Sequence, residues 1–358
     1  MKSKNVIKIF ISLFLALTVI TAFKFIDGLN DAALAPLLDE TIEYLVPDDI
    51  YDPDALLHVA QTPLDDPYDE AYYDSYEDIN NSYEDIFIDP GYVLLRMDPS
   101  DIHFGALILV NPDVVFVFPN EHQNDLIRIA DYISDVFGIT SDQMILSASI
   151  LAPLNQMMEE FNEYTGVTNV VIRSAFRSLS GQRQIFDDMV RRWGRTGALL
   201  WAALPGHSEH HTGLAFDFGI RRGGQTEMFA GTGLYSWIPR NSHRFGFILR
   251  YPENKTSITR TNFEPWHYRY VGIPHASIMR ANNWVLEEYI DWIRGYTFEE
   301  PYTFIFNDIE YTIYFTSELY VKLPYDVDFK ISGNNIDGFI VTIWQDPARF
   351  DAETGGEV

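Results

Sequence analysis

Hydrophobic residues in the central part of the chain fall into short runs and into helical spacings. Apolar runs at 92–95, 107–110 and 113–119 are typical of strands. Apolar residues at mixed spacings over 126–136, and at spacings of four, three and four over 150–161, predict two helices. This part of the chain therefore combines both types of element.

The residues that follow repeat both patterns. Strands are expected at 167–172, 213–220, 245–251 and 266–271, and helices at 182–193 and 278–293. Helices and strands occur in groups and do not alternate regularly, which favours the α+β class.

The C-terminal part of the chain has a different character. Aromatic and β-branched residues dominate at 302–306, 311–315 and 339–344, and Asn and Gly separate these runs. We therefore expect a β-rich extension, a small β appendage, over 298–348 and a disordered tail at 349–358.

Residues 1–30 have the pattern of an export segment. Lys2 and Lys4 precede an apolar run whose charge-free part, 9–23, is 15 residues long and is closed by Lys24. Because about 20 residues span a bilayer comfortably, both a cleaved signal peptide and a retained membrane anchor fit this segment. A lipoprotein anchor is excluded, since the chain has no cysteine. We expect an extracytoplasmic protein.

An acidic segment follows at 31–90. Between Asp39 and Asp89 it holds 17 Asp and Glu residues, and no Lys or Arg occurs between Lys24 and Arg96. Such a bias is typical of an extended, disordered linker, because like charges repel and few apolar residues are available for a core. A near-repeat of Tyr-Glu-Asp-Ile within it leaves a binding motif as the alternative.

The composition limits the chemistry that the chain can perform. A formal net charge of −27 argues against nucleic acid or an anionic membrane surface as a partner, because both require clustered Lys and Arg. The absence of cysteine excludes disulfides, thiolate metal sites and cysteine nucleophiles. Only nitrogen and oxygen ligands remain for a metal ion.

The first segment with candidate chemistry is 208–217, which reads Ser-Glu-His-His-Thr-Gly-Leu-Ala-Phe-Asp. His210 and Asp217 are seven residues apart, so a regular strand would point them to opposite faces. A turn at Thr212 and Gly213 would bring them together. A surface loop followed by an ordinary strand is the alternative interpretation.

A second segment, 263–270, again combines a carboxylate with an imidazole. Glu264 lies three residues before His267, and Pro265 between them argues against a helix. An extended or turned segment would then offer His267 as a metal ligand and leave Glu264 to act on water. On its own, this spacing is common.

Together, His210, Asp217 and His267 form a ligand set of the catalytic zinc type, which leaves a fourth position open for water. Two neutral imidazoles and one carboxylate offset only one of the two zinc charges, so the ion would remain an effective Lewis acid. Glu264 would serve as the general base and pass the proton to the leaving amine.

A third segment, 173–195, holds six Arg and two Asp. In an acidic chain this local excess of positive charge suggests a site for an anion such as the terminal carboxylate of a peptide. Arg177 is the first candidate, because it precedes the helix expected from Gln182. The other arginines fit the solvated face of that helix: Arg183, Arg191, Arg192 and Arg195.

In this order the three segments closely resemble the VanY-type D-alanyl-D-alanine carboxypeptidases, whose pattern is Ser-x-His-x-x-Gly-x-Ala-x-Asp followed by Glu-x-Trp-His. Every position of that pattern matches here, and the similarity extends from 105–111 through 176–178 and 205–208 to 270–272. The resemblance implies a catalytic domain at 91–297 with a small antiparallel sheet and flanking helices around one zinc ion.

Carried over position by position, the resemblance assigns a role to each candidate. It implies zinc ligands at His210, Asp217 and His267, catalytic roles for Glu264 and Arg177, and substrate contacts at Arg177, Gln182 and Ser208. His207 and His211 fall on variable positions and are expected to be bystanders. Phe176 replaces the commoner Tyr, and the glycine usual before the Glu motif is missing from 258–263.

The sequence thus predicts a zinc metallocarboxypeptidase that acts on peptidoglycan stem peptides, either membrane-anchored through its N-terminal segment or secreted to the cell wall. An L,D-carboxypeptidase acting on tetrapeptide stems is the alternative within the same class. A non-catalytic wall-binding protein with a structural zinc ion is the alternative outside it. The sequence indicates no oligomeric state, and a motif at 331–339 resembles an extension of some relatives without indicating its role.

Overall fold

The computed structural model describes residues 86–89, 91–118, 125–199 and 201–345. The predicted signal or anchor at 1–30, the linker up to residue 85 and the predicted tail at 349–358 lie outside the described residues. Within the described part, no helix is both long and apolar enough to cross a membrane. By its contacts the chain divides into two units, and the smaller one contributes residues 186–199 and 201–202 to the described part.

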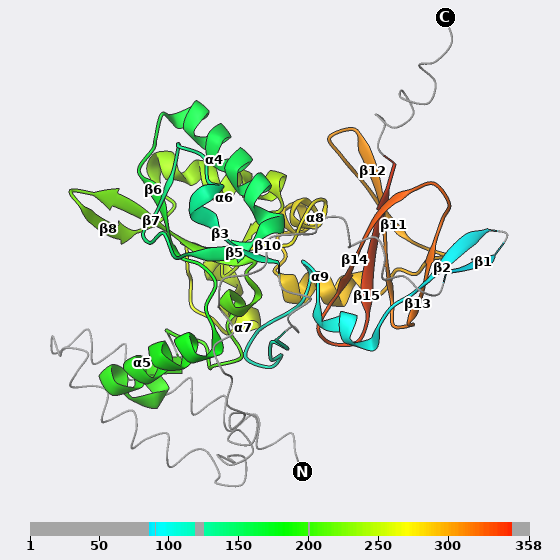
Figure 1. The fold of residues 1–358 in the computed structure, drawn as a ribbon, viewed down its shortest axis with the longest axis horizontal. Coiled ribbons are helices and arrows are strands. Elements are labelled where there is room, and N and C mark those ends of the chain that lie inside the picture. Colours follow the sequence, from blue (N-terminus) through cyan, green and yellow to red (C-terminus); the bar gives the residue numbers. More distant parts are fainter. Residues whose placement is uncertain (1–85, 90, 119–124, 200, 346–358) are drawn as a thin grey trace, which may run out of the picture. The chain divides into compact units, whose positions relative to one another are not determined.

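The main sheet has the strand order β4-β6-β7-β10-β9, and β8 pairs with β7 (Figure 1). Its strands are β4 Gly138–Ile139, β6 Val170–Ser174, β7 Ala215–Arg222, β8 Gln225–Met228, β9 Phe247–Leu249 and β10 His267–Tyr270. Within this sheet β4 and β6 run parallel, and the other pairs are antiparallel. The predicted α+β class with a small, mainly antiparallel sheet is confirmed.

Helix α4, Leu151–Thr165, forms where the apolar spacing predicts a helix. Leu154 and Phe161 are fully buried and share a core with Phe216 and Phe218 of the sheet. The helix ends where Gly166 adopts a φ of 71°, a conformation that glycine takes without strain. Short helices complete the fold: α6 Trp237–Asn241, α7 Thr256–Thr259, and 3₁₀ turns at Pro99–His103, Ala148–Ile150, Gly233–Ser236, Ser242–Phe245 and Glu253–Lys255.

The single helix expected over 278–293 is in fact two helices, α8 His275–Asn282 and α9 Leu286–Ile293. Asn283 follows α8 with a φ of 54°, which stops the helix. Asparagine tolerates this left-handed conformation better than most residues, so the apolar periodicity continues across a break in the backbone.

The helix expected over 126–136 is wrong. This segment begins as β3, Leu126–Arg128, which pairs with β5, Ile145–Ser147, and continues as a 3₁₀ turn at Ile129–Asp131. Ile129 is fully buried in the main core, and Ile127, Ile133 and Val136 pack against it, but the mixed spacing of these residues belongs to a strand and a turn.

The strands expected at 107–110 and 113–119 are also absent from the described residues. Leu107 and Val110 are buried, as the apolar runs suggest. Backbone groups of this segment bond to side chains and loops from elsewhere in the chain, so its burial does not require a strand ladder.

The C-terminal extension forms a four-stranded antiparallel sheet of order β11-β12-β15-β14. Its strands are β11 Tyr302–Phe306, β12 Ile309–Thr316, β14 Asp328–Gly333 and β15 Phe339–Trp344. The three strands expected here are confirmed, and β14 is an addition.

Another strand of the extension changes the predicted domain boundaries. β13, Tyr320–Leu323, pairs with β2, Tyr92–Arg96, which in turn pairs with β1, Ile86–Asp89. Leu95 of β2 is buried in one core with Val341 of β15. The predicted linker end at residue 90 is therefore too late, and β2 packs with the extension and not with the main sheet.

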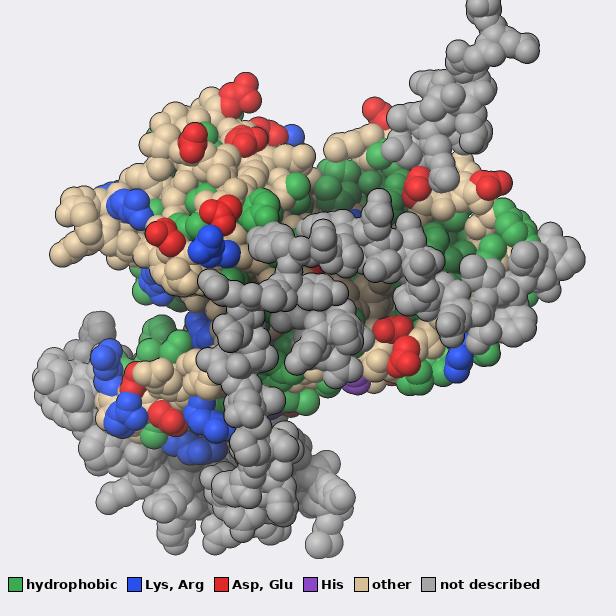
Figure 2. Space-filling view, viewed as in Figure 1, with side chains coloured by type: hydrophobic (Ala, Val, Ile, Leu, Met, Phe, Trp, Pro, Cys, Tyr) green, Lys and Arg blue, Asp and Glu red, His purple; other side chains and the backbone are tan. Residues whose placement is uncertain are grey.

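Helix α5, Leu179–Leu199, contains a non-helical Gly194 with a φ of 70°, so it is two helical pieces around a kink. Figure 2 shows Lys and Arg side chains gathered over this helix. The arginines predicted to form a solvated face are exposed: Arg183, Arg191, Arg192 and Arg195.

Candidate metal and active site

The pairing of β7 with β10 brings two of the predicted ligands together. Asp217 lies directly opposite His267 in the antiparallel register. His210 lies on the 3₁₀ turn Glu209–Thr212, and Gly213 returns the chain into β7 with a φ of 70°. The predicted turn favours glycine because of this left-handed conformation, which other residues rarely adopt.

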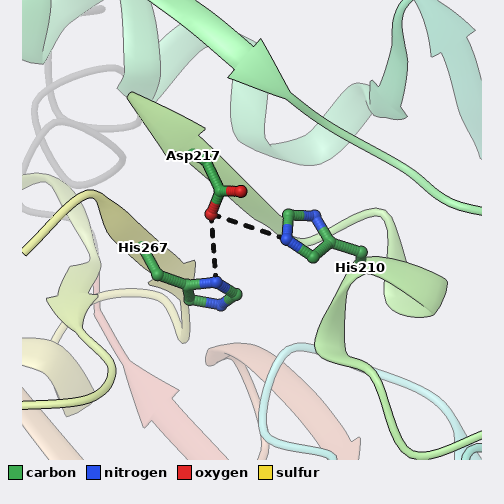
Figure 3. Close-up of side chains that lie close together, drawn as sticks. All are labelled: His210, Asp217 and His267. Atoms are coloured by element: carbon green, nitrogen blue, oxygen red, sulfur yellow. Dashed lines mark ion pairs between the residues drawn. The ribbon is translucent and has the colours of Figure 1, made fainter. Parts of the chain in front are cut away.

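All three predicted ligands are buried and point toward one common position (Figure 3). Asp217 Oδ1 lies 3.5 Å from His210 Nε2 and 3.2 Å from His267 Nδ1. The ligand atoms lie within 4.8 Å of one another. In a tetrahedral zinc site with bonds of about 2 Å, ligand atoms are separated by roughly 3.3 Å. The spacing therefore matches a metal ion.

The carboxylate of Asp217 supplies a further test of this fit. Its Oδ1 atom is buried and accepts no hydrogen bond from the described residues. A buried oxygen without a hydrogen bond reduces the stability of the fold, and ligation of a cation removes that penalty. The donor set of two imidazoles and one carboxylate suits zinc.

The outer nitrogens of both imidazoles have partners that orient the rings. His210 Nδ1 donates to the Ala175 carbonyl over 2.7 Å, which leaves Nε2 to face the site. His267 Nε2 lies 3.4 Å from Glu209 Oε2, which leaves Nδ1 to face it. Such partners fix which nitrogen is free to bind a metal.

Glu264 lies beside the cluster, with Oε2 3.5 Å from His267 Nδ1. The segment around Pro265 is a turn, as predicted, because the His267 amide donates to the Glu264 carbonyl over 3.2 Å before β10 begins. Burial raises the pKa of Glu264 to about 7. A carboxyl group with this pKa can exchange a proton with substrate and water near neutral pH.

Arg177 and Gln182, the predicted substrate contacts, lie together. Arg177 Nη1 donates to Gln182 Oε1 over 2.5 Å, and Nη2 donates to Ser174 Oγ over 2.9 Å. The Arg177 amide donates to the His210 carbonyl over 3.0 Å, which ties this arginine to the ligand turn. Burial lowers the pKa of Arg177, while Asp217 and Glu264 act in the opposite direction. The guanidinium is thus a buried positive charge that interacts electrostatically with both site carboxylates.

Ser208 and the two other histidines of this loop lie close to the ligands. Ser208 is buried directly before the ligand turn. His207 Nδ1 donates to the Asn111 carbonyl over 2.8 Å, and His211 Nδ1 donates to the Arg177 carbonyl over 2.6 Å. Both histidines hold the loop backbone, which agrees with their predicted place outside the ligand set.

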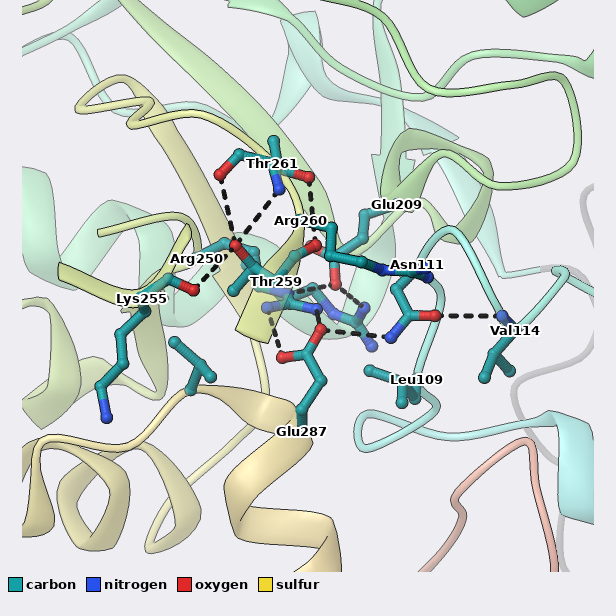
Figure 4. Close-up of polar contacts among 12 residues, drawn as sticks. Leu109, Asn111, Val114, Glu209, Arg250, Lys255, Thr259, Arg260, Thr261 and Glu287 are labelled. Carbon is teal, nitrogen blue, oxygen red and sulfur yellow. Dashed lines mark hydrogen bonds and ion pairs between the residues drawn. The ribbon is translucent and has the colours of Figure 1, made fainter. Parts of the chain in front are cut away.

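Four charged residues form a mostly buried group that contacts His267 through Glu209. The sequence does not predict this group. The charged quartet consists of Glu209, Arg250, Arg269 and Glu287 (Figure 4 shows three of them). Glu209 Oε1 accepts from Arg250 Nε over 2.7 Å and from Arg269 Nη1 over 3.0 Å. Arg250 also forms two hydrogen bonds with Glu287, of 2.7 and 2.8 Å.

The charged quartet balances two positive and two negative side chains, of which only that of Glu287 is partly exposed, by 12%. Arg250, Arg269 and Glu209 have fully buried side chains. Burial raises the pKa of Glu209, but the two arginines outweigh that effect and hold the pKa well below its usual range. A signal exists in the sequence, because both arginines interrupt apolar strands, and a charge in such a strand needs a buried partner.

The chain is similar to known carboxypeptidases. Residues 143–273 match the VanY family model, described as D-alanyl-D-alanine carboxypeptidase. A D-alanyl-D-alanine carboxypeptidase of Enterococcus faecium is 32% identical over 249 residues, which cover 68% of this chain and 76% of that protein. The putative carboxypeptidase YodJ of Bacillus subtilis (strain 168) is 34% identical over 201 residues, covering 55% and 63% of the two chains.

Among solved structures, the vancomycin resistance D,D-dipeptidase VanXYg in complex with a D-Ala-D-Ala phosphinate analogue is similar, with a TM-score of 0.63 and 32% identity. The match covers 70% of this chain and 98% of that one. The fold and the site define a peptidase of the carboxypeptidase class. The chain belongs to the family of VanY-type D-alanyl-D-alanine carboxypeptidases.

Proposed function

We propose that this protein is a zinc-dependent D-alanyl-D-alanine carboxypeptidase that hydrolyses the terminal peptide bond of peptidoglycan stem peptides. The observation that carries the proposal is the convergence of His210, Asp217 and His267 around one position, with Glu264 beside it. Asp217 Oδ1 is buried there with no hydrogen bond from the described residues, as a ligand atom would be before the ion binds.

The proposed chemistry divides the roles among these residues. His210 Nε2, Asp217 Oδ1 and His267 Nδ1 would hold one zinc ion. When bound, the ion supplies a Lewis acid that polarises the scissile carbonyl and lowers the pKa of the attacking water. Glu264 would take a proton from water and deliver it to the leaving amine, because its carboxyl group lies beside the ligand cluster.

Arg177 supplies the positive charge for substrate binding in this proposal. A guanidinium pairs well with a carboxylate, and the terminal carboxylate is what a carboxypeptidase must recognise. Gln182 accepts a hydrogen bond from this guanidinium, and Ser208 is buried directly before the ligand turn, so we propose both as further substrate contacts.

The names of similar proteins support the choice of substrate. The Enterococcus faecium relative is a D-alanyl-D-alanine carboxypeptidase, and the VanXYg structure contains a D-Ala-D-Ala analogue. We further propose that the protein acts outside the cytoplasm, anchored through residues 1–30 or secreted to the cell wall, because Lys2 and Lys4 precede an apolar run there.

The test is release of D-alanine from a stem pentapeptide that ends in D-Ala-D-Ala. Zinc-loaded wild type should release D-alanine, and Glu264→Gln should lower the rate at least about a hundredfold, because general base catalysis contributes that much. Glu253→Gln changes an exposed glutamate and should leave the rate unchanged.

Two results would overturn parts of this proposal. Release of the terminal residue from a tetrapeptide but not from the pentapeptide would replace it by an L,D-carboxypeptidase. Equal rates for wild type and Glu264→Gln would remove Glu264 from its role as the base.

A further inference from the structure

The turn between β14 and β15 is stabilised by its own asparagines. With the last two residues of β14 it is called the 332–338 turn. Asn334 Oδ1 accepts hydrogen bonds from the amides of Ile336, Asp337 and Gly338 at 2.9, 2.9 and 3.2 Å. Asn334 is fully buried, and Asn335 adopts a φ of 63°. The 332–338 turn is therefore a defined structure with a fixed outward face, and the carboxypeptidase pattern does not explain it.

The 332–338 turn forms hydrogen bonds with residues 106–116, the segment for which strands are wrongly predicted. Asn335 Nδ2 donates to the carbonyls of Leu109 and Val115 over 2.8 and 2.9 Å. The Leu109 amide donates to the Asn334 carbonyl over 3.1 Å, and the Leu107 amide donates to Ser332 Oγ over 2.9 Å. These bonds take the place of a strand ladder for the 106–116 segment.

The backbone of Gly333 also lies against residues 102–104, just before the 106–116 segment. A Cβ atom on Gly333 would lie 2.1 Å from the Ile102 carbonyl oxygen. The Gly333 amide donates to the Phe104 carbonyl over 2.8 Å. The glycine in the motif is required because the two backbones touch.

The opposite side of the 106–116 segment supports the charged quartet. Arg269 Nη2 donates to the carbonyls of Ala106 and Ile108 over 3.0 and 2.8 Å. Through Nη1 the same guanidinium binds Glu209, whose other oxygen faces His267 Nε2. A continuous chain of buried polar contacts thus runs from the 332–338 turn to a proposed metal ligand.

A second connection runs from the same segment to the loop before Ser208. The Asn111 carbonyl accepts from His207 Nδ1, and the Phe116 amide donates to the Gly206 carbonyl over 2.8 Å. Asn111 Nδ2 also reaches Glu287 over 3.3 Å, a contact that Figure 4 shows together with the bond to Val114.

We propose that Asn335 is a positioning residue for the active site. By holding the 106–116 segment, its side chain places Arg269 and Glu209 behind His267 and fixes the loop that leads to Ser208. The C-terminal extension is then part of the catalytic machinery and not an independent module. This inference rests on the proposed zinc site, but its closing experiment also reports on the protein without substrate.

The decisive variant is Asn335→Gly. Glycine accepts a φ of 63° without strain, so this change removes the side-chain donors and leaves the turn backbone possible. Asn307→Gly is the matched control, because Asn307 also has a positive φ, of 51°, and lies exposed between β11 and β12 of the same sheet.

Three measurements on the full-length protein test this series of contacts. Amide hydrogen exchange of 106–116 should become faster in Asn335→Gly. Zinc affinity, from competition with a chelator, should fall by about tenfold or more, the usual loss when the partner of a ligand imidazole is disturbed. kcat/KM should fall as well, and Asn307→Gly should match wild type in all three.

The zinc measurement decides the proposal. Faster exchange in Asn335→Gly with wild-type zinc affinity and kcat/KM would reduce the 332–338 turn to a structural contact and overturn the inference. If Asn335→Gly does not fold, Ser332→Ala removes the acceptor of the Leu107 amide, together with the bond from the Ser332 hydroxyl to the Gly333 carbonyl, and should show the same changes at smaller size. Should wild type release no D-alanine, the proposed function fails, while zinc affinity and exchange still test the positioning role.

Discussion

Two neighbouring clusters of buried charge differ in one respect that separates chemistry from architecture. In the charged quartet, each carboxylate is matched by a guanidinium at hydrogen-bond distance, as for Arg250 between Glu209 and Glu287. In the ligand cluster, Asp217 Oδ1 is equally buried yet accepts no hydrogen bond from the described residues. We call the charged quartet the closed network, because its carboxylates are all paired and stabilise the fold. We call the ligand cluster the open network, because its buried carboxylate oxygen has no hydrogen bond and is available to bind an ion.

The largest loss of stability is expected from a substitution in the charged quartet. Glu209→Ala leaves two guanidinium groups buried around one missing carboxylate, and removal of one partner from a buried ion pair costs about 3–5 kcal/mol. We expect this decrease in the unfolding free energy of the metal-free protein, measured by denaturation with urea. A loss below about 1 kcal/mol would mean that the quartet is not the rigid support described here.

The open cluster should instead contribute stability only when it is filled. Zinc at a hundredfold excess over its dissociation constant should raise the unfolding free energy by about 2.7 kcal/mol, because only the folded chain assembles the three ligands. Asp217→Asn should abolish this zinc-dependent gain, measured by thermal unfolding with and without a chelator. An unchanged gain in Asp217→Asn would place the ion elsewhere.

Proton competition sharpens the contrast further. Burial lowers the pKa of His267, but the neighbouring carboxylates of Asp217 and Glu209 outweigh it and raise the pKa to about 9 in the metal-free protein. A ligand imidazole must be neutral, so the proton bound below that pH competes with zinc. Apparent zinc affinity should fall about tenfold for each pH unit below about 9.

Glu209→Gln provides the control for this pH dependence. The variant removes one of the contacts that raise the pKa of His267, so proton competition should begin at a lower pH than in wild type. Titration of zinc against a chromophoric chelator across this pH range measures both proteins. An affinity that does not change with pH would show that no proton leaves His267 on binding.

The smallest effect is expected at the surface. Arg128 and Asp131 form an ion pair of 3.0 Å, but their side chains are 54% and 58% exposed. Asp131→Ala should therefore change the unfolding free energy by less than about 1 kcal/mol, because water screens the pair. A loss as large as that of Glu209→Ala would show that burial does not control the strength of these pairs.

The ligand cluster could be predicted because its residues lie in two short, recognisable segments. The turn at Gly213 and the pairing of β7 with β10 then bring His210, Asp217 and His267 together. Glu264 and Arg177 also lie where the pattern places them. Local sequence identifies the residue types within each segment, whereas the pairing of β7 with β10 joins distant positions and follows from no local spacing.

The charged quartet could not be predicted, since its members come from separate elements. Glu209 lies on a 3₁₀ turn, Arg250 follows β9, Arg269 lies on β10 and Glu287 lies on α9. No spacing in the sequence links these positions. Both arginines lie in ranges where strands are expected, 245–251 and 266–271, and such charges indicate only that some partner must exist.

Wrong strand predictions have the same origin. The run at 107–110 is apolar and buried, but its backbone bonds to Ser332, Asn334 and Asn335, which lie more than two hundred positions later. Similarly, β2 pairs with β13, so no local signal could show that the predicted domain boundary separates two strands of one sheet. The N-terminal export segment and the acidic linker up to residue 85 stay predictions.

The central claim is that His210, Asp217 and His267 hold one zinc ion. A crystal structure with anomalous scattering data at the zinc edge tests it most directly. We predict a single peak at about 2.0–2.2 Å from His210 Nε2, Asp217 Oδ1 and His267 Nδ1. A peak bound by other atoms, or none at this position in zinc-loaded protein, would contradict it.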